Sequence, residues 1–409
     1  MINFKKINSY IISLCLCFIM FGGSSRIGEL KNLFLITLLI CSIFNIILEK
    51  KIVFNKNFLT LTLIVFTCYF LVQILYSYDR SSTISFLFSW IVFIIFTISY
   101  KPNSEFWKIL INCIFDFSLA VAVSIIITII DKNFILTFLK PIVPTSEIAI
   151  NVFKSEIVQG IYSGIAFERA YAACQLNLGL AIVMAEFFSN KKLSNIKIFG
   201  IIIIIIALLC TGKRTLFLIP ILCFLILSFL SKKSNILVKY LKLLPLMILI
   251  IILVVIVFPQ SQKVFERFSN NNSEVNTMDI RNENYWQYCK EMFLTKPILG
   301  YGINSFKHYV SLKRSTDIYN AHNIYFQILA ECGIMGEIML VIIFAKMIKY
   351  SSYSLKKINS DNNDITYFII YLEILFYIYG LTGNVFYYTS QLIFYFLIIL
   401  YFTNLKGSE

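Results

Sequence analysis

Long apolar runs recur along this 409-residue chain, and they restrict the folds open to it. An α-helix needs about 20 mostly apolar residues to cross the hydrocarbon core of a bilayer. Twelve such runs cover residues 9–24, 30–48, 57–76, 83–99, 106–130, 170–189, 195–211, 214–230, 241–258, 323–345, 364–382 and 386–403. The composition, 58% hydrophobic and 14% charged, is far from that of a soluble globular protein. The sequence predicts an all-α membrane protein with about 12 transmembrane helices.

Lysine and arginine are distributed unevenly between the segments that connect these runs. When the N-terminus is placed inside and the runs alternate, 19 basic residues fall in inner segments and five in the short outer loops. Basic residues are enriched in short cytoplasmic loops. The count predicts that both termini lie inside, and orientation then explains most of the net charge of +14. We therefore expect the lipid bilayer, and no nucleic acid, as a partner.

Two long connections on the predicted outer side interrupt this alternation, at residues 131–168 and 259–321. Both lie within a single polytopic membrane domain that we expect to cover residues 1–409. In the second connection, apolar residues recur at helical spacing: Tyr285, Tyr288, Cys289, Met292 and Phe293. This spacing predicts an amphipathic helix that lies on the outer surface of the membrane. We therefore expect the large extracytoplasmic loop to carry short amphipathic helices.

A polar stripe follows where the large loop returns to apolar sequence. A helix that begins at Asn323 places Asn323, Gln327 and Glu331 on one face, because residues four apart are neighbours on a helix. Polar side chains are costly in contact with lipid. We therefore expect the stripe to face protein or a water-filled cavity.

The residues before this helix contain both histidines of the chain, His308 and His322, and two glycines, Gly300 and Gly302. The glycines follow Pro297 at a spacing that predicts a tight turn. A single histidine at a helix start is more often a cap or a buried hydrogen-bonding group than a catalyst. The position of His322 beside the polar stripe favours chemistry, because a neutral imidazole can accept a proton from a hydroxyl. We assign no role to His308.

Basic residues on the predicted outer side are the other candidates for chemistry. Lys213 and Arg214 form a positive pair in a very short outer loop, against the orientation rule, which favours an anionic partner such as phosphate. The alternative for Arg214 is a side chain that extends from a helix end to the interface. The alternative for Arg281 is a solvated loop charge, and the alternatives for Arg169 are an ion pair with Glu168 or anchoring at the membrane interface.

Motifs for several other kinds of chemistry are missing from the sequence. There is no P-loop, no dinucleotide-binding glycine motif and no spacing of histidines or cysteines that suits a metal. The ten cysteines lie mostly in apolar runs, where they behave as small hydrophobic residues. We therefore expect neither a cofactor nor a metal.

Three segments resemble motifs of the O-antigen polymerase and O-antigen ligase superfamily of bacterial membrane glycosyltransferases. T-G-K-R-T-L-F at 211–217 is similar to the Thr-x-x-Arg start of a family helix. Residues 281–302 are similar to the part of its periplasmic loop that leads to a P-x-x-G-x-G turn. A-H-N-I-Y at 321–325, with E-C-G-I-M-G at 331–336, is similar to its H-N-x-(Y/F)…E-x-G-x-x-G motif. The family layout of twelve helices with both ends inside also resembles the expected topology.

The resemblance implies transfer of a glycan from an undecaprenyl-diphosphate carrier, on the extracytoplasmic side of the bacterial inner membrane, without metal or nucleotide sugar. It implies catalytic roles for His322, Arg214 and Arg281, and substrate-binding roles for Arg169, Lys213, Asn323, Glu331, Gly300 and Gly302. The cations would stabilise the diphosphate that leaves. His322 would accept or orient the proton of the incoming hydroxyl. The implied partners are the undecaprenyl-diphosphate-linked oligosaccharide, a chain-length regulator and a flippase.

Several readings of the function remain open at this point. H-N-I-Y…E-C-G is more similar to the polymerase form of the motif, which favours a repeat-unit polymerase of O-antigen or capsule over an O-antigen ligase that uses lipid A core or a protein as acceptor. A transporter of lipid-linked oligosaccharides is an alternative of another class. Transporters often contain inverted repeats and broken helices, and we expect neither here. A receptor or structural protein would leave Lys213, Arg214 and the polar stripe unexplained.

Overall fold

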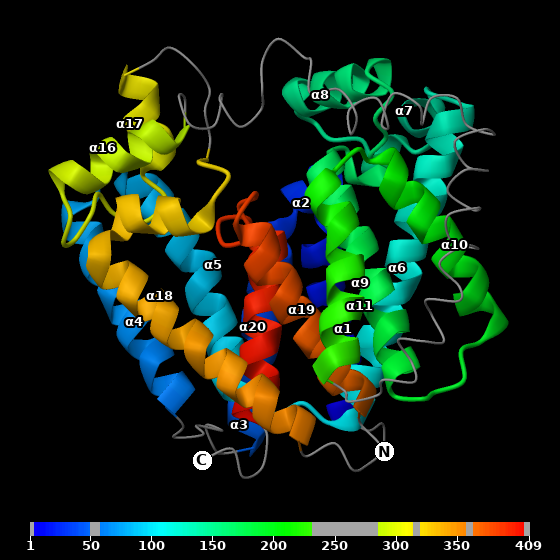
Figure 1. Ribbon diagram of the computed structural model, residues 1–409, viewed down its shortest axis with the longest axis horizontal. Helices are drawn as coiled ribbons and strands as arrows, with labels where there is room; N and C mark the ends of the chain where they lie inside the picture. The colour runs from blue at the N-terminus through cyan, green and yellow to red at the C-terminus, as the bar shows by residue number, and fades with distance from the viewer. Residues whose placement is uncertain (1–3, 50–57, 231–284, 314–319, 357–362, 405–409) are drawn as a thin grey trace. The chain divides into compact units, whose positions relative to one another are not determined.

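The computed structural model describes residues 4–49, 58–230, 285–313, 320–356 and 363–404. Every regular element in these residues is helical (Figure 1). The α-helices are α1 (Phe4–Gly22), α2 (Arg26–Glu29), α3 (Lys31–Glu49), α4 (Phe58–Tyr76), α5 (Arg80–Ser99), α6 (Ser104–Ile130), α7 (Phe134–Phe138), α8 (Glu147–Val158), α9 (Arg169–Phe188), α10 (Asn195–Cys210), α11 (Arg214–Leu230), α16 (Gln287–Thr295), α17 (Phe306–Lys313), α18 (Ile324–Lys356), α19 (Asn363–Gly380) and α20 (Thr389–Thr403). Two 3₁₀ turns are η1 (Lys140–Ile142) and η2 (Gly164–Ala166).

Eleven of the twelve predicted apolar runs coincide with helices in the described residues, and the run at 241–258 lies outside them. Five described helices are long and apolar enough to cross a membrane: Leu59–Tyr76, Arg80–Ser99, Ser104–Ile130, Arg169–Phe188 and Ile324–Lys356. Shorter apolar helices cover Lys6–Gly22, Lys31–Ile47, Asn195–Cys210, Arg214–Leu230 and Thr389–Thr403. The chain is therefore a multi-pass helical membrane protein. The number of twelve spans and the inside position of both termini stay predictions.

Polar residues at the helix starts explain several of the helix boundaries. Asn103 accepts a hydrogen bond from the Phe106 N–H at 2.7 Å, where α6 begins. Asp79 accepts one from the Ser82 N–H at 3.0 Å, where α5 begins. Each side chain satisfies one of the first N–H groups of a helix, which have no partner within the helix itself.

The chain divides into two compact units, each described here by itself. Unit 1 consists of Met1–Phe34, Asn103–Asn271 and Ile358–Ile374. Unit 2 consists of Leu35–Pro102, Asn272–Lys357 and Leu375–Glu409. The single membrane domain expected over residues 1–409 stays a prediction.

In unit 1, α6 packs along α1 and α9, and α10 packs against α6 and α9. Helices α6 and α9 approach closely at Gly179, where a Cβ atom would lie 2.7 Å from the Cβ of Ser118. The Ser118 hydroxyl donates to the Gln175 carbonyl at 2.8 Å. Asn177, which is fully buried, joins α9 to α11 by donating to the Leu216 carbonyl at 3.0 Å. Small and polar residues thus fix how these apolar helices pack.

Residues 131–168, predicted as the first long outer loop, connect α6 to α9 in unit 1. The described chain there forms α7, η1, α8 and η2 in succession. Helix α8 carries a buried carboxylate, Glu156, which becomes important for the candidate site.

In unit 2, the core is formed by aromatic residues of α4, α5 and α20. The Trp90 side chain is fully buried, and its ring lies 5.1 Å from that of Phe70 and 5.0 Å from that of Phe396. Its indole N–H donates to the Thr67 hydroxyl at 3.0 Å, so the one polar atom of the ring is satisfied.

Helix α18 is broken near its start, which corrects the expectation that the chain has no broken helix. Gly333 has φ 62° and ψ −169°, a conformation outside the helical range. Figure 1 shows the resulting change in direction of α18. The sequence does contain the signal, because glycine adopts a positive φ at little cost.

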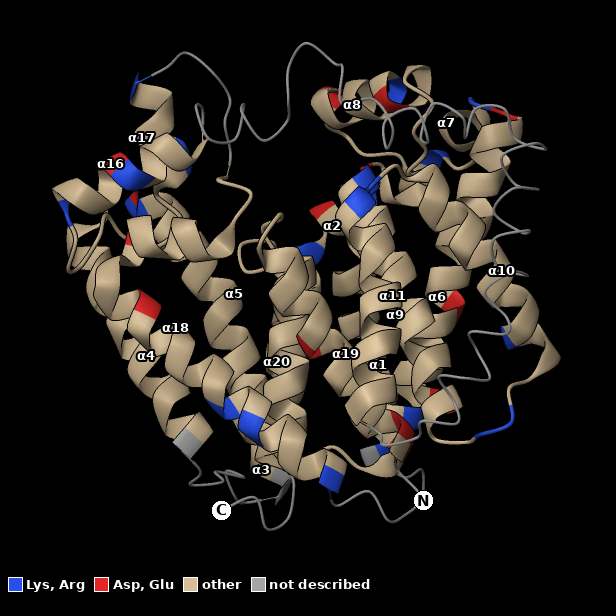
Figure 2. Cartoon of the chain, viewed as in Figure 1, with Lys and Arg blue, Asp and Glu red and all other residues tan. Residues whose placement is uncertain are grey.

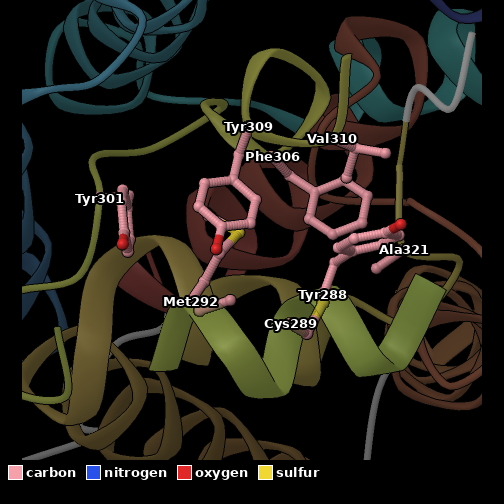
Figure 3. Packing of buried hydrophobic residues seen from close by; sticks show 9 residues of the cluster. Tyr288, Cys289, Met292, Tyr301, Phe306, Tyr309, Val310 and Ala321 are labelled. Carbon is pink, nitrogen blue, oxygen red and sulfur yellow. The ribbon is translucent and has the colours of Figure 1, made fainter. Parts of the chain in front are cut away.

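The amphipathic helix predicted after Arg281 exists as α16, and its predicted place on the membrane surface stays a prediction. Its apolar face, with Tyr288, Cys289 and Met292, is buried against other protein residues. The cluster that covers it is shown in Figure 3 and consists of Tyr288, Cys289, Met292, Tyr301, Phe306, Tyr309, Val310, Ala321 and Ala330. Residues of α17 and α18 therefore occupy the face that we expected lipid to cover.

Candidate functional site

The backbone around His322 is held by three side chains of unit 2. The Trp286 indole N–H donates to the Ala321 carbonyl at 3.1 Å, and the Ala321 N–H donates to Gln327 Oε1 at 2.9 Å. On the other side of His322, Asn323 Oδ1 accepts from the N–H groups of the following residues Tyr325 and Phe326, at 3.1 and 3.2 Å. Asn323 therefore caps the start of α18.

His322 itself has a backbone conformation that residues other than glycine rarely adopt. Its φ is 54°, in the left-handed region. Such conformations cost free energy and persist where the surrounding contacts determine them, often at functional sites. Here the contacts of Trp286, Gln327 and Asn323 supply that determination. The imidazole is half-buried, packs against the Tyr285 ring at 5.6 Å, and lies with Nδ1 3.3 Å from Asn384 Nδ2.

The polar stripe of α18 faces protein, as predicted. Asn323 is 7% exposed, and Gln327 and Glu331 are fully buried. Gln327 Nε2 donates to Glu331 Oε1 and to Asn320 Oδ1, both at 3.1 Å. Gln327 and Glu331 thus share one hydrogen-bond network with Asn320, and Asn323 is paired with backbone N–H groups, which avoids the cost of unpaired polar groups in an apolar helix.

Glu331 uses both carboxylate oxygens to hold the segment before α17. Oε2 accepts from the Asn304 N–H at 2.7 Å, and Oε1 accepts from the Phe306 N–H at 2.8 Å. These contacts make Glu331 a cap for the start of α17. The substrate-binding role predicted for Glu331 stays a prediction, and its contacts describe a structural role.

The predicted turn at Gly300 and Gly302 docks onto the break in α18. The Ile334 N–H donates to the Pro297 carbonyl at 2.9 Å, and the Gly302 N–H donates to the Glu331 carbonyl at 2.7 Å. The break removes helical hydrogen bonds, and the turn supplies replacements. The two segments approach so closely that a Cβ at Gly300 would be 2.3 Å from the Glu331 carbonyl oxygen.

The predicted cations form a second group, in unit 1. Lys213 and Arg214 follow the left-handed Gly212 in the turn between α10 and α11, and Arg169 is the first residue of α9. Figure 2 shows basic residues where α11 begins, and the rest of that helix is uncharged. The Arg214 side chain is exposed, whereas Lys213 is half-buried.

Two carboxylates accompany these cations: Glu156, which is buried, and Glu168, which is half-buried. Arg169 Nε lies 3.5 Å from Glu156 Oε1, so its closest ion-pair partner is Glu156 of α8 rather than the predicted Glu168. Glu168 Oε2 instead accepts from the Ser24 hydroxyl at 3.1 Å. Nothing in the local sequence indicated Glu156, because it is distant from Arg169 along the chain.

Burial shifts the protonation of this group toward neutral forms. Burial raises the pKa of Glu156 to about 7, against the opposing attraction of Arg169. Burial, and then the charge of Arg169, lower the pKa of Lys213 to about 8, against the attraction of Glu168 and Glu156. Burial also raises the pKa of Glu168. The net charge of the group therefore changes across the physiological pH range.

The predicted site residues thus fall into two sets. The first set, in unit 2, contains His322, Asn323, Glu331, Gly300 and Gly302, and hydrogen bonds connect its segments. The second set, in unit 1, contains Arg169, Lys213 and Arg214. Arg281 lies outside the described residues. Sequence reasoning missed Glu156 and Asn384, because no motif marks either residue.

Comparison with known proteins adds one match. A family model described as O-antigen ligase matches residues 199–341. Among curated proteins, no relative matches the chain. The matched range contains the α10–α11 turn, α16, α17 and the first part of α18, and therefore both Arg214 and His322. In the part of the chain that the structure describes, no three His, Cys, Asp or Glu side chains gather in a way that could hold a metal ion.

Proposed function

We propose, from the O-antigen ligase family domain that this chain carries at residues 199–341, that the protein is a repeat-unit polymerase of a bacterial surface polysaccharide. Members of this family are membrane enzymes of glycan synthesis. The donor is a glycan linked to undecaprenyl diphosphate, and the acceptor is the non-reducing-end sugar hydroxyl of another carrier-linked repeat. The reaction takes place on the extracytoplasmic side of the plasma membrane.

The bond changes balance without a co-reactant. The acceptor hydroxyl oxygen forms a bond to the anomeric carbon of the donor glycan, and the anomeric C–O bond to the carrier diphosphate breaks. The diphosphate leaves with the electron pair, and the hydroxyl proton passes to His322. Attack opposite the leaving group inverts the anomeric centre.

The observation that carries this proposal is the restrained position of His322. A proton acceptor must be held in a fixed geometry to be effective. His322 occupies a left-handed backbone position, and Trp286, Gln327 and Asn323 fix the residues on both sides of it. Phe167 and Asn304 also have a positive φ two residues before α9 and α17, so the φ of His322 alone does not mark a catalyst, and the contacts on both sides of it carry the argument.

The second set of residues supports the other half of the reaction. A departing diphosphate develops negative charge, and fixed cations stabilise it. Arg214 is exposed at a helix start, where N–H groups also attract anions. Lys213 precedes Arg214 in the chain, and Arg169 begins α9 in the same unit. We assign both residues to binding of the donor. Arg281 receives from its motif the same catalytic role as Arg214, stabilisation of the diphosphate that leaves.

Transfer to lipid A core or to a protein is the second candidate function. The description of the matching family model, O-antigen ligase, favours it. The donor chemistry is the same in both reactions, and only the acceptor differs. Asn323, Gly300 and Gly302 would serve either acceptor by holding the segments around His322.

Reconstitution of the purified chain with a carrier-linked oligosaccharide repeat tests these functions. Products are separated by size, with and without lipid A core. We expect a ladder of multiple repeats from the wild type and no product from His322→Ala, while His308→Ala, the matched histidine control, retains the ladder. A single addition that requires lipid A core would replace the polymerase with the ligase. Movement of the donor across vesicle membranes without any glycan transfer would replace both enzyme functions with that of a transporter, a class in which broken helices are common.

A further inference from the structure

Asn384 lies in the connection between α19 and α20, and its amide is a polar group in contact with the His322 ring. Asn384 Nδ2 is 3.3 Å from His322 Nδ1. The side chain of Asn384 is 1% exposed, so it is held in place by surrounding protein. Both residues belong to unit 2.

One atom of this amide has no partner. Asn384 Oδ1 is buried and accepts no hydrogen bond from the residues that the structure describes. Buried polar atoms are nearly always paired, and an exception calls for an explanation. The two ends of an asparagine amide have almost the same shape, so the oxygen and nitrogen can exchange places by rotation about the terminal bond.

The two orientations of the amide select different forms of the histidine. With Nδ2 toward the ring, Asn384 donates to a bare Nδ1, and the ring proton resides on Nε2. With Oδ1 toward the ring, Asn384 accepts from Nδ1–H, and Nε2 is bare. Only the second form leaves Nε2 able to accept a proton.

We propose that Asn384 is a positioning residue for His322: its Oδ1 accepts from Nδ1–H and thereby keeps Nε2 unprotonated. This inference rests on the proposed function, because it names the residue that prepares His322 for the incoming sugar hydroxyl. The rotated amide gives the unpaired Oδ1 a donor, and the NH₂ group then takes the position that Oδ1 had. It also explains why a fully buried amide, rather than an apolar residue, contacts the ring.

During transfer, the proton of the acceptor hydroxyl moves to Nε2, and the ring becomes an imidazolium. Its positive charge is shared with Nδ1–H, which already donates to Asn384 Oδ1. The hydrogen bond strengthens as the charge forms, since hydrogen bonds from ionised donors are stronger. Asn384 therefore acts through His322 and does not contact the reacting atoms.

The test measures the tautomer of His322 directly. The full-length protein, with ¹⁵N in its histidine rings, is reconstituted in lipid and studied by solid-state NMR. Since the chain has two histidines, His308→Gln leaves only the signals of His322. The pH is raised until the ring is neutral. We expect a protonated Nδ1 and a bare Nε2 in this background, and a mixture of tautomers after Asn384→Leu.

Two further variants make the result specific. Asn384→Asp keeps an oxygen acceptor and should retain the Nδ1–H form. Thr382→Val, in the same connection, removes a hydroxyl that, like Asn384 Oδ1, has no described hydrogen-bond partner. This variant should leave the tautomer unchanged. A protonated Nε2 in the parent, or the same tautomer in the parent and Asn384→Leu, would overturn the proposal.

Turnover in the reconstituted assay separates this inference from the proposed function. We expect Asn384→Leu to lower kcat by roughly tenfold or more with little change in KM for the donor, and Asn384→Asp to recover part of the loss. If the tautomer changes but kcat does not, the positioning contact is supported and the proton-accepting role of His322 is the part that fails.

Discussion

The two sets of candidate residues are held in place by different forces. Around His322, the contacts are mostly hydrogen bonds between neutral groups, and the network from Asn320 through Gln327 to Glu331 is continuous. Around Lys213, groups of opposite charge lie partly or fully buried in unit 1, and burial raises the pKa of Glu156 and lowers that of Lys213, which favours the neutral forms. The first arrangement fixes the position of His322, whereas the net charge of the second changes with pH. A proton acceptor requires the former, and a group that binds and releases an anion is suited by the latter.

The largest expected effect comes from the geometric side of this comparison. His322→Gln removes the proton acceptor and should lower kcat by on the order of 10²–10⁴-fold. The thermal unfolding temperature should change little, because the backbone contacts of Trp286 and Asn323 do not involve the imidazole. Comparable kcat values for His322→Gln and His308→Gln would show that the restrained position has no catalytic purpose.

Arg214 tests the electrostatic side. Arg214→Ala should lower kcat by about 10²–10³-fold, because a fixed cation at the leaving group contributes that amount in comparable sites. Arg214→Lys should recover a part of the loss, since lysine keeps the charge without the bidentate geometry. Measurement of kcat and of donor KM separates the roles: a rise of KM alone would make Arg214 a binding residue only.

Gly333→Ala should destabilise unit 2 through its backbone. The added Cβ would lie 2.3 Å from the Ile298 carbonyl oxygen at a φ of 62°. We expect a loss of roughly 2–3 kcal/mol, measured by thermal or denaturant unfolding. Gly212→Ala is the matched control: its φ is 63°, but the nearest atom to its Cβ would be 3.7 Å away, so it should lose only about 1 kcal/mol. Equal losses would mean that the contact between turn and break carries no stability.

The smallest effect concerns pH and the cation group. Glu156 gains a proton as pH falls through about 7, and Lys213 gains one as pH falls through about 8. Both changes make the group more positive, by between one and two charges, so donor KM should fall several-fold between pH 8.5 and pH 6. Glu156→Gln should flatten the lower part of this dependence. An unchanged profile would indicate that the carboxylate of Glu156 does not compete for Arg169.

Much of the helical content could be predicted from the sequence, because apolar runs specify helices locally. The polar stripe was predicted for the same reason: Asn323, Gln327 and Glu331 share a face by spacing alone, and the cost of polar groups in lipid requires burial. The protein contacts of α16 were not predictable in this way. An amphipathic face indicates that something apolar covers it, but Tyr288 and Met292 do not tell whether lipid or protein does so.

Contacts between distant segments explain the remaining failures. The pairing of Arg169 with Glu156 depends on how α8 returns to the start of α9, which no local pattern specifies. Asn384 contacts His322 only because the α19–α20 connection lies beside the start of α18. The break at Gly333 had a local signal in glycine, yet the segment that fills it begins at Pro297, in a different part of the chain.

The docking of that turn has a consequence for anyone who exchanges parts between related proteins. The segment 297–302 and the segment 331–335 share their backbone hydrogen bonds, and glycines on both sides allow the approach. Neither segment is complete alone, although about thirty residues separate them. A chimera that takes the loop from one parent and the helix from another would combine a turn and a helix break from different proteins, without the matching backbone contacts. Crossover points belong before Pro297 and after Met335, so that the pair is inherited together.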